Sequence, residues 1–398
     1  MKLRALVYFT QFSAALGGSE YLPLTLVSEL QKRCRVTLAL NWESDVAAAA
    51  RTMGIAIDMP ALEVVLVKPR SGFLRRLDAV LPFYRTWQLK KLAKQADICI
   101  SAANMFDFGR PAHHFVFLLR HFGDNAFFDF VTRTKRSSGA ALRQKLRTIL
   151  AEGILRPLLG VRSTRRILAD RREHIYPNSR YVETLMRDFY GEFNSQIFYP
   201  PTTFEPGAAP PVRDPLRVVC LGQIFPEKRV TEIISIVEKA RRLSGMDVTL
   251  RIGGPLGPTP YVEKVKSMAA ARPWIELAGG VYGDAKSDFL QGATYAIHAE
   301  RDEAFGISVT EYLKAGVIPI VPDEGGTAEV VDNAQLAYRD NAGASEILLR
   351  LLTDDAFREE CRSHCAKRAA EFTLGRYLER QHALLETIVD EAEREAEA

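Results

Sequence analysis

Short apolar runs alternate with longer amphipathic stretches along most of this chain. The runs are rich in β-branched residues, and the stretches between them repeat apolar positions at helical spacing. Parallel strands that are buried on both faces have such near-continuous apolar runs, whereas a half-exposed strand alternates apolar with polar residues. The pattern therefore predicts an α/β protein with two successive parallel sheets, each covered by helices on both faces.

The predicted strands fall into two groups, separated by a proline-rich stretch without periodicity, Tyr199–Pro215, which is typical of a linker. The strands are Ala5–Phe9, Val36–Leu40, Glu63–Val67, Ile98–Ser101, Phe115–Leu119 and Ile175–Pro177 in the first group, and Arg217–Leu221, Val248–Ile252, Ile275–Leu277, Tyr295–His298 and Ile318–Val321 in the second. We predict doubly wound, Rossmann-like domains over residues 1–205 and 206–375. A C-terminal helix over residues 376–398 is expected to pack back across the junction.

Composition agrees with this picture. A chain of 398 residues is long enough for two domains, and 47% hydrophobic with 26% charged residues is typical of a soluble globular protein. No apolar run is long enough to span a bilayer, and the basic-then-apolar start is interpreted as a first strand rather than a signal peptide. Five scattered cysteines favour a reducing compartment, so a cytoplasmic location is expected.

Charge is distributed unevenly along the chain. The net charge of +4 combines a basic first half with an acidic second half, and the most basic stretch is Arg133–Arg172. Leucines and isoleucines recur within this stretch at roughly helical spacing. It is read either as a basic amphipathic surface for an anionic membrane or as a solvated pair of core-packed helices. No nucleic acid is expected as a partner, since the stretch has no known binding motif and no interleaved aromatic residues.

One segment combines a strand, a short acidic loop, a helix and a second strand. The loop carries Glu303, the helix is predicted to begin near Ile307, and Gly316 is placed to end it. A helix start offers unpaired N–H groups and the positive end of a dipole, which suit a phosphate. Glu303 and Glu311 flank this anion site, so the segment suits a ligand with central phosphates and a sugar at each end.

The frame E-A-F-G-I-S-V-T-E from Glu303 to Glu311, followed by A-G-V-I-P-I-V, resembles the paired-glutamate motif of retaining glycosyltransferases of family 4, which have the GT-B fold. The resemblance implies that Glu303 contacts the donor sugar and Glu311 the donor ribose. It also implies that the backbone of Phe305, Gly306 and Ile307 holds the donor diphosphate. An ordinary strand-to-helix turn with two solvated glutamates is the alternative reading.

Further donor-binding residues follow from the same resemblance. Gly17 and Gly18, after the first strand, resemble the N-terminal loop that faces the diphosphate across the cleft between the two domains. Lys228 matches the family's diphosphate-binding lysine, while Gln223 stands where the family usually has an arginine. Val281 is expected to border the nucleotide base.

The acceptor side departs from the family pattern. The histidine that helps to place the reacting sugar is expected at Phe117, and the nearby candidates are His113, His114 and His121. No metal is expected, because the potential ligands on one helix, at residues 361, 364 and 365, lack a further partner. No cofactor is expected beyond the nucleotide-diphospho-sugar co-substrate.

The resemblance implies a metal-independent, retaining enzyme that moves a hexose from a nucleotide-diphospho-sugar to a glycan or lipid-linked acceptor in cell-surface polysaccharide synthesis. Glu303 and Lys228 are its expected catalytic residues, and the inner face of the membrane is a second expected location. Two alternatives remain: a nucleotide-sugar epimerase of similar fold, and a non-catalytic member that binds a glycan.

Overall fold

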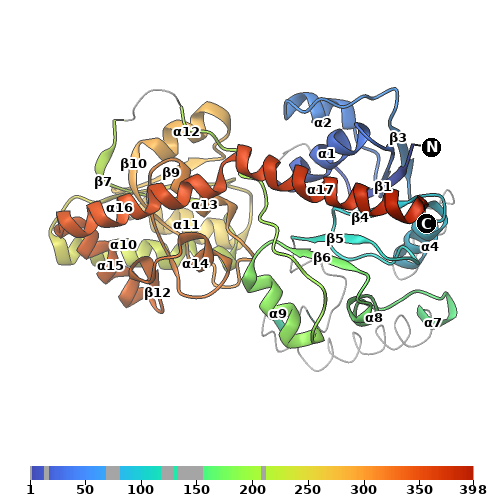
Figure 1. Ribbon diagram of the computed structural model, residues 1–398. Helices are drawn as coiled ribbons and strands as arrows, with labels where there is room; N and C mark the ends of the chain where they lie inside the picture. Colours follow the sequence, from blue (N-terminus) through green and yellow to red (C-terminus); the bar gives the residue numbers. More distant parts are fainter. Residues whose placement is uncertain are drawn as a thin grey trace. The chain divides into compact units, whose positions relative to one another are not determined.

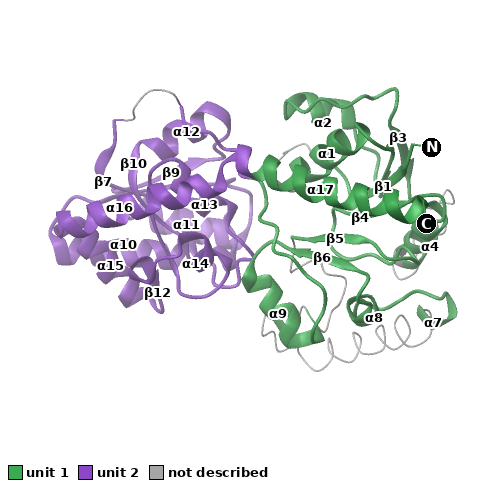
Figure 2. Ribbon diagram, viewed as in Figure 1, with its two compact units in different colours: residues 1–201, 377–398 green, residues 202–376 purple. Residues whose placement is uncertain are grey.

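The structure, a computed structural model, describes residues 2–12, 18–68, 81–117, 127, 130–131, 156–207 and 212–397. It divides into two compact units (Figure 2). Unit 1 comprises residues 1–201 and 377–398, and unit 2 comprises residues 202–376. The predicted linker, Tyr199–Pro215, contains the boundary between residues 201 and 202.

Unit 1 contains a parallel six-stranded sheet with the strand order β3-β2-β1-β4-β5-β6. Its strands are β1 (Arg4–Phe9), β2 (Arg35–Leu40), β3 (Glu63–Leu66), β4 (Ile98–Ser101), β5 (His113–Val116) and β6 (His174–Pro177). The chain winds outward from β1 to β3 and then returns to β4 on the other side of β1. This reversal is the mark of a doubly wound sheet.

Unit 2 repeats the arrangement with the order β12-β11-β10-β7-β8-β9. Its strands are β7 (Asp214–Leu221), β8 (Thr249–Gly253), β9 (Ile275–Gly279), β10 (Ala293–Ile297), β11 (Ile318–Pro322) and β12 (Ala337–Tyr338). Here the winding direction reverses between β7 and β10. In open α/β sheets, ligands bind beyond the carboxyl ends of the strands at this topological switch point.

Helices pack on both sheets (Figure 1). Those in unit 1 are α1 (Gly18–Gln31), α2 (Val46–Thr52), α4 (Leu81–Ala93), α7 (Arg156–Leu158), α8 (Thr164–Ala169), α9 (Arg180–Tyr190) and most of α17 (Leu374–Glu397). Those in unit 2 are α10 (Val230–Ser244), α11 (Pro260–Ala270), α12 (Gly283–Gln291), α13 (Ile307–Lys314), α14 (Gly326–Val331), α15 (Asn341–Thr353) and α16 (Asp355–Ala369). No helix in the described ranges has both the length and the apolar composition that a bilayer span requires.

The central strands are buried on both faces, as their continuous apolar runs predict, whereas the edge strands β3 and β9 are partly exposed. Every residue of β4, β10 and β11 is buried, and so are all residues of β1 after Arg4. Helix α10 contributes a buried face of Ile233, Ile234 and Val237 to the core of unit 2. The prediction of two doubly wound, parallel α/β sheets is therefore confirmed.

Most strands differ from their predicted bounds by about one to three residues at an end, and two differences have a clear physical cause. Strand β5 is His113–Val116, so it begins before the predicted start at Phe115, because the polar residues at its start obscure an otherwise buried strand. His114 is buried there, since Glu173 gives its ring a polar partner. The last two residues of the predicted range, 118 and 119, lie outside the described residues. The two-residue strand β12, Ala337–Tyr338, is missing from the prediction because it is too short for a periodic signal.

Helix α17 returns the chain to unit 1. The side-chain amide of Gln381, fully buried, donates to Thr25 Oγ1 and to the Tyr377 hydroxyl at 2.9 Å each. Nearer the C-terminus, Arg33 of unit 1 pairs with Asp390 and Glu393 of the helix at 2.7 Å. The buried Gln381 contacts specify the seating of the helix, whereas the exposed ion pairs add little free energy.

Candidate functional site

Helix α13 begins where the acidic loop ends, and a glycine makes this possible. Gly306 is the N-cap residue with φ 95°, a left-handed conformation that favours glycine. A Cβ atom at this position would lie 2.5 Å from Thr327 Cγ2. The helix ends at Lys314, and Gly316 follows with φ 70°, so the predicted start at Ile307 and the glycine stop agree with the structure.

A second glycine turn, Gly325-Gly326, packs against the backbone of the acidic loop. The Gly326 N–H donates to the Glu303 carbonyl oxygen at 2.8 Å, and a Cβ atom on Gly325 would lie 2.4 Å from the Arg301 carbonyl oxygen. The turn that leads into α14 therefore touches the loop backbone directly. This contact keeps the loop carrying Glu303 in one position.

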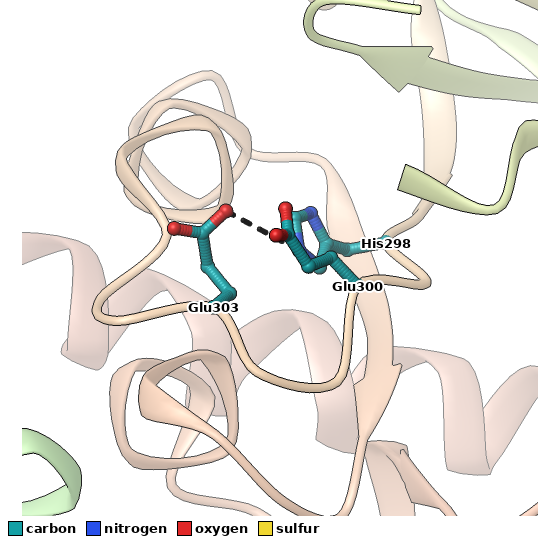
Figure 3. Close-up of side chains that lie close together, drawn as sticks. All are labelled: His298, Glu300 and Glu303. Atoms are coloured by element: carbon teal, nitrogen blue, oxygen red, sulfur yellow. Dashed lines mark ion pairs between the residues drawn. The ribbon is translucent and has the colours of Figure 1, made fainter. Parts of the chain in front are cut away.

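The side chains of Lys228, Glu300 and Glu303 form one ion-pair cluster. Lys228 ends the 3-10 turn after β7, and the two glutamates lie on the loop after β10. The Lys228 ammonium lies 2.7 Å from Glu300 Oε2 and 2.5 Å from Glu303 Oε2. Figure 3 shows the carboxylate of Glu303 pointing toward Glu300 and the His298 ring. The cluster thus lies beyond the carboxyl ends of β7 and β10, at the switch point of the unit 2 sheet.

Charge and burial in this cluster oppose each other. Burial disfavours the charge of Glu303, but the Lys228 ammonium outweighs it and lowers the pKa of Glu303 to about 2. Burial also disfavours the charge of Lys228, yet Glu303 and Glu300 together raise its pKa above the ordinary value. The cluster therefore holds an ammonium and at least the Glu303 carboxylate in charged form at neutral pH.

His298 lies at the edge of the cluster and is neutral. Its Nε2 atom is 3.8 Å from Glu303 Oε2, is buried, and makes no hydrogen bond. Burial, followed by the nearby Lys228 charge, lowers the pKa of His298 to about 3. A small cavity is lined by His298, Lys228 and Gln223 among mostly apolar residues, so these three groups border the same space.

His298, Glu300 and Glu303 are also the one group within the described ranges whose side chains are placed to share a metal ion. Their ligand atoms lie within 4.8 Å of one another. In this structure the Lys228 ammonium pairs with both carboxylates of the group. The cysteines at 361 and 365 are buried thiols whose pKa values are raised by burial. Metal independence stays a prediction.

Glu311, the second glutamate of the motif, is also engaged in an ion pair. It lies on α13, is buried, and accepts from the Lys286 ammonium of α12 at 2.7 Å. The same ammonium lies 5.8 Å from the centre of the Phe204 ring. A ribose bound by Glu311 would therefore meet a carboxylate that already has one cationic partner.

The remaining predicted donor residues are distributed over both units. Phe305 is buried and packs edge-on against Phe372 at 5.8 Å, so its side chain belongs to the core and only its backbone is available to a ligand. Val281 follows β9 and is partly exposed. Gly18 begins α1 in unit 1, whereas Gly17 lies outside the described residues. Their predicted contacts with a diphosphate stay predictions.

The candidate acceptor histidines have structural partners. His114 is fully buried; its Nε2 lies 2.9 Å from Glu173, and its Nδ1 accepts from the Phe106 N–H at 3.5 Å. His113 contacts the Tyr176 hydroxyl at 3.0 Å, and burial lowers the pKa of His113 to about 3. Both rings thus have packing partners in unit 1. His121 lies outside the described residues, and no contact favours an acceptor role for the other two.

Three residues of the site were missing from the sequence prediction: His298, Glu300 and Lys286. The run Glu300-Arg301-Asp302-Glu303 did hold a signal, because two carboxylates three residues apart in a tight loop can reach the same cation. Lys286 gave no such signal, since its partner Glu311 is 25 residues away and on another helix.

Comparison with known proteins connects this geometry to a family. Residues 204–371 match the family model described as glycosyl transferases group 1. The match covers most of unit 2. The matched range contains the Lys228 cluster and the whole of α13. No match was found among curated proteins.

Solved structures of several glycosyltransferases are similar to almost the full length of this chain. HepE of Anabaena, solved with UDP and glucose, has a TM-score of 0.65 at 13% identity and covers 97% of this chain and 100% of its own. WaaG, a glycosyltransferase involved in lipopolysaccharide biosynthesis, has a TM-score of 0.63 at 14% identity, and the match covers 96% of this chain and 99% of WaaG. Sucrose-phosphate synthase of Thermosynechococcus elongatus has a TM-score of 0.66 at 12% identity, and the match covers 98% of this chain and 99% of the synthase. These likenesses confirm the GT-B fold.

Proposed function

We propose that this protein is a group 1 glycosyltransferase, a retaining enzyme of family 4 that moves a hexose from a nucleotide-diphospho-sugar to an acceptor hydroxyl. The main support is a single observation: Lys228 and the paired-glutamate loop meet at the switch point of the unit 2 sheet. The sheet places ligands there whatever their chemistry. The ammonium and the helix start beside it select an anion.

Donor binding uses three parts of unit 2. The backbone N–H groups at the start of α13 and the Lys228 ammonium hold the diphosphate. Glu303 accepts hydrogen bonds from the sugar hydroxyls, and Glu311 accepts from the ribose. The solved HepE complexes with UDP and UDP-glucose support a nucleotide-sugar as the donor class.

The reaction itself breaks the bond between the sugar anomeric carbon and the diphosphate oxygen. Negative charge grows on the departing diphosphate, where Lys228 and the α13 amides stabilise it. These groups supply the positive charge that a metal ion provides elsewhere, so the reaction is expected to be metal-independent. The acceptor oxygen forms its bond to the anomeric carbon on the face that the diphosphate leaves, and the hydroxyl proton passes to the departing diphosphate oxygen. Attack from that face preserves the anomeric configuration.

We infer a glycan or lipid-linked acceptor from the basic first half of the chain, and a role in cell-surface polysaccharide synthesis. WaaG, with a similar fold, acts in lipopolysaccharide biosynthesis. A cytoplasmic protein working at the inner face of the membrane would bring the basic stretch Arg133–Arg172 near anionic lipids.

The first test is a thermal-shift screen against UDP-, GDP- and ADP-sugars, followed by transfer assays with the sugar that shifts melting most. A ligand that binds only the folded state raises the melting temperature. Glu303→Ala is expected to lower turnover by at least about a hundredfold, since it removes a contact to the reacting sugar. Glu263→Ala, on the exposed face of α11, is the matched control. Undiminished turnover by Glu303→Ala would refute the donor role of Glu303.

A non-catalytic glycan-binding role is the second candidate, and two substitutions favour it. Gln223 replaces a cation expected at the diphosphate, and Phe117 replaces the expected histidine. Such a protein would bind a glycan without releasing nucleoside diphosphate from any donor. An epimerase would instead change the sugar of the donor when no acceptor is present, so product analysis with donor alone identifies that function. Calorimetry of nucleotide-sugar binding separates the non-catalytic role from the two enzymes.

A further inference from the structure

Lys286 gives a cationic partner to Glu311, the second glutamate of the motif, and the motif itself does not contain this lysine. The Lys286 ammonium donates to Glu311 Oε1 at 2.7 Å, and the two side chains are 24% and 9% exposed. The other carboxylate oxygen, Glu311 Oε2, has no partner among the described residues and keeps some contact with solvent. One oxygen of Glu311 is therefore engaged by the lysine, and the other is available to a ligand.

Packing holds this pair in place. Lys286 lies on the first turn of α12, and its ammonium is also 5.8 Å from the centre of the buried Phe204 ring. Glu311 lies on α13, where the hydroxyl of the preceding Thr310 contacts the buried Thr202 hydroxyl at 2.7 Å. Ion pairs between mobile surface side chains contribute little, because ordering them costs side-chain entropy. The Lys286–Glu311 pair avoids most of this cost, since both side chains are largely ordered before a ligand binds.

The position of the pair in unit 2 matches that of a ribose. Glu311 lies on the second turn of α13, whose start is the proposed diphosphate site. Lys286 lies on the first turn of α12, directly after the loop with Val281 that is expected to border the base. The pair thus connects the helix at the diphosphate to the helix at the base. In a nucleotide, the ribose joins these same two groups.

The two charged groups complement each other toward a sugar hydroxyl. A hydroxyl donates one hydrogen bond and accepts up to two, whereas an ionised carboxylate only accepts and an ammonium only donates. Glu311 alone would bind the hydroxyl hydrogens and leave the oxygens without a donor. Lys286 has three N–H donors, so it can keep one on Glu311 Oε1 and give another to a ribose oxygen. Hydrogen bonds to charged groups are stronger than those between neutral groups.

We propose that Lys286 is a specificity-determining residue, which together with Glu311 binds the 2′- and 3′-hydroxyls of the donor ribose and so selects ribonucleotide over 2′-deoxyribonucleotide donors. This inference rests on the proposed function, since it needs a ribose at Glu311. A 2′-deoxy donor would leave the ammonium and the carboxylate without that hydroxyl. Sites built to bind a hydroxyl reject analogues that lack it, because their own polar groups are then left unpaired.

Discrimination is measured first on the unaltered protein. UDP and 2′-deoxy-UDP are titrated calorimetrically under the same conditions, since neither nucleotide carries a sugar that could be transferred. We expect 2′-deoxy-UDP to bind about 10- to 100-fold more weakly, as the loss of a hydrogen bond to charged groups implies. The corresponding pair of adenosine or guanosine nucleotides replaces these two if the thermal-shift screen selects another base. Equal affinities would overturn the proposal without the need for any variant.

Lys286→Met then tests the lysine. Methionine keeps an unbranched apolar side chain but removes the ammonium, so the ratio of the two dissociation constants is expected to fall about tenfold. Lys286→Arg keeps a cation and should restore most of the ratio. Lys264→Met, at an exposed position of α11, is the matched control and should leave the ratio unchanged. Both nucleotides are measured on the same preparation, so a partly unfolded variant still reports a valid ratio. An unchanged ratio in Lys286→Met would refute the role of Lys286.

The same titrations separate this inference from the function on which it rests. Should UDP, ADP and GDP all fail to bind the unaltered protein, the proposed donor function fails. Glu311→Ala is expected to lose the discrimination as well, and full discrimination by that variant would end the ribose role of Glu311. Should Glu311→Ala lose discrimination while Lys286→Met keeps it, only the role of Lys286 fails.

Discussion

The ammonium of Lys228 stabilises the site only while its carboxylate partners are ionised. Because the Lys228 ammonium outweighs burial and lowers the pKa of Glu303 to about 2, the folded chain favours the ionised form. A lowered pKa stabilises the fold above the unfolded-state value, and this contribution is lost as the pH falls toward the folded-state value. The pKa of Lys228 is raised, so the charged lysine stabilises the fold at neutral pH. This stabilisation is lost only as the pH rises into strong base.

We therefore expect the stability difference between the unaltered protein and Glu303→Gln to be constant from about pH 5 to pH 9 and to shrink below about pH 4.5. Urea unfolding of both proteins across this range measures it. Glu263→Gln, whose exposed carboxylate pairs with Lys266 at 2.9 Å, is the control and should differ from the unaltered protein by under about 1 kcal/mol throughout. A Glu303→Gln difference that grows in acid would contradict the assignment of a lowered pKa.

Some residues of the candidate site could be predicted from the sequence, and others could not. Glu303, Glu311 and Lys228 were predictable because motif spacing and a strand-to-helix turn marked them. His298 and Glu300 differ, since their importance depends on an ammonium about 70 residues earlier in the chain. Long-range pairing of this kind leaves no periodic pattern.

The two ends of helix α13 could be predicted from the sequence. Glycine at the N-cap and glycine after the last turn are both required by positive φ values, so the sequence marked both boundaries. Strand β5 shows the reverse, because two histidines stand where an apolar run was expected. A polar residue is tolerated in a buried strand when another element supplies its partner, and the pattern alone does not reveal that partner.

Gly306→Ala is expected to destabilise the protein by about 1–3 kcal/mol and to weaken donor binding. The added methyl group would meet Thr327 and force a left-handed backbone on alanine. Gly257→Ala, where a methyl group would meet nothing within 4 Å, is the matched control. Thermal unfolding with and without the donor measures both effects. Equal melting of the two variants would show that the strain at Gly306 is absent.

At the scale of the whole molecule, charge asymmetry rather than fold predicts the setting in which the protein works. The first half is basic, and the stretch Arg133–Arg172 concentrates that charge. Electrostatic attraction to an anionic bilayer contributes about 1 kcal/mol for each basic residue near the surface and is screened by salt.

We expect the full chain to sediment with phosphatidylserine vesicles and to remain in solution with phosphatidylcholine vesicles. Replacing three basic residues of the stretch with glutamine should weaken binding by about a hundredfold at low salt. The tested set is Arg133, Lys135 and Arg136, and the charge-matched control set from the second half is Arg242, Lys264 and Lys367. Equal loss in both sets would indicate a general charge effect instead of a membrane-binding stretch.

The sequence by itself determined the alternation of strands and helices, the two parallel sheets and the turn that starts α13, because these depend on local periodicity and on glycine and proline chemistry. It also determined which residues carry the family motif. Only the tertiary structure decided that Glu300 shares Lys228 with Glu303, that Lys286 pairs with Glu311, and that α17 belongs to unit 1. Those contacts join residues far apart in the chain. Their geometry depends on how strands are ordered in a sheet and on which helix packs where, and a one-dimensional pattern does not record either.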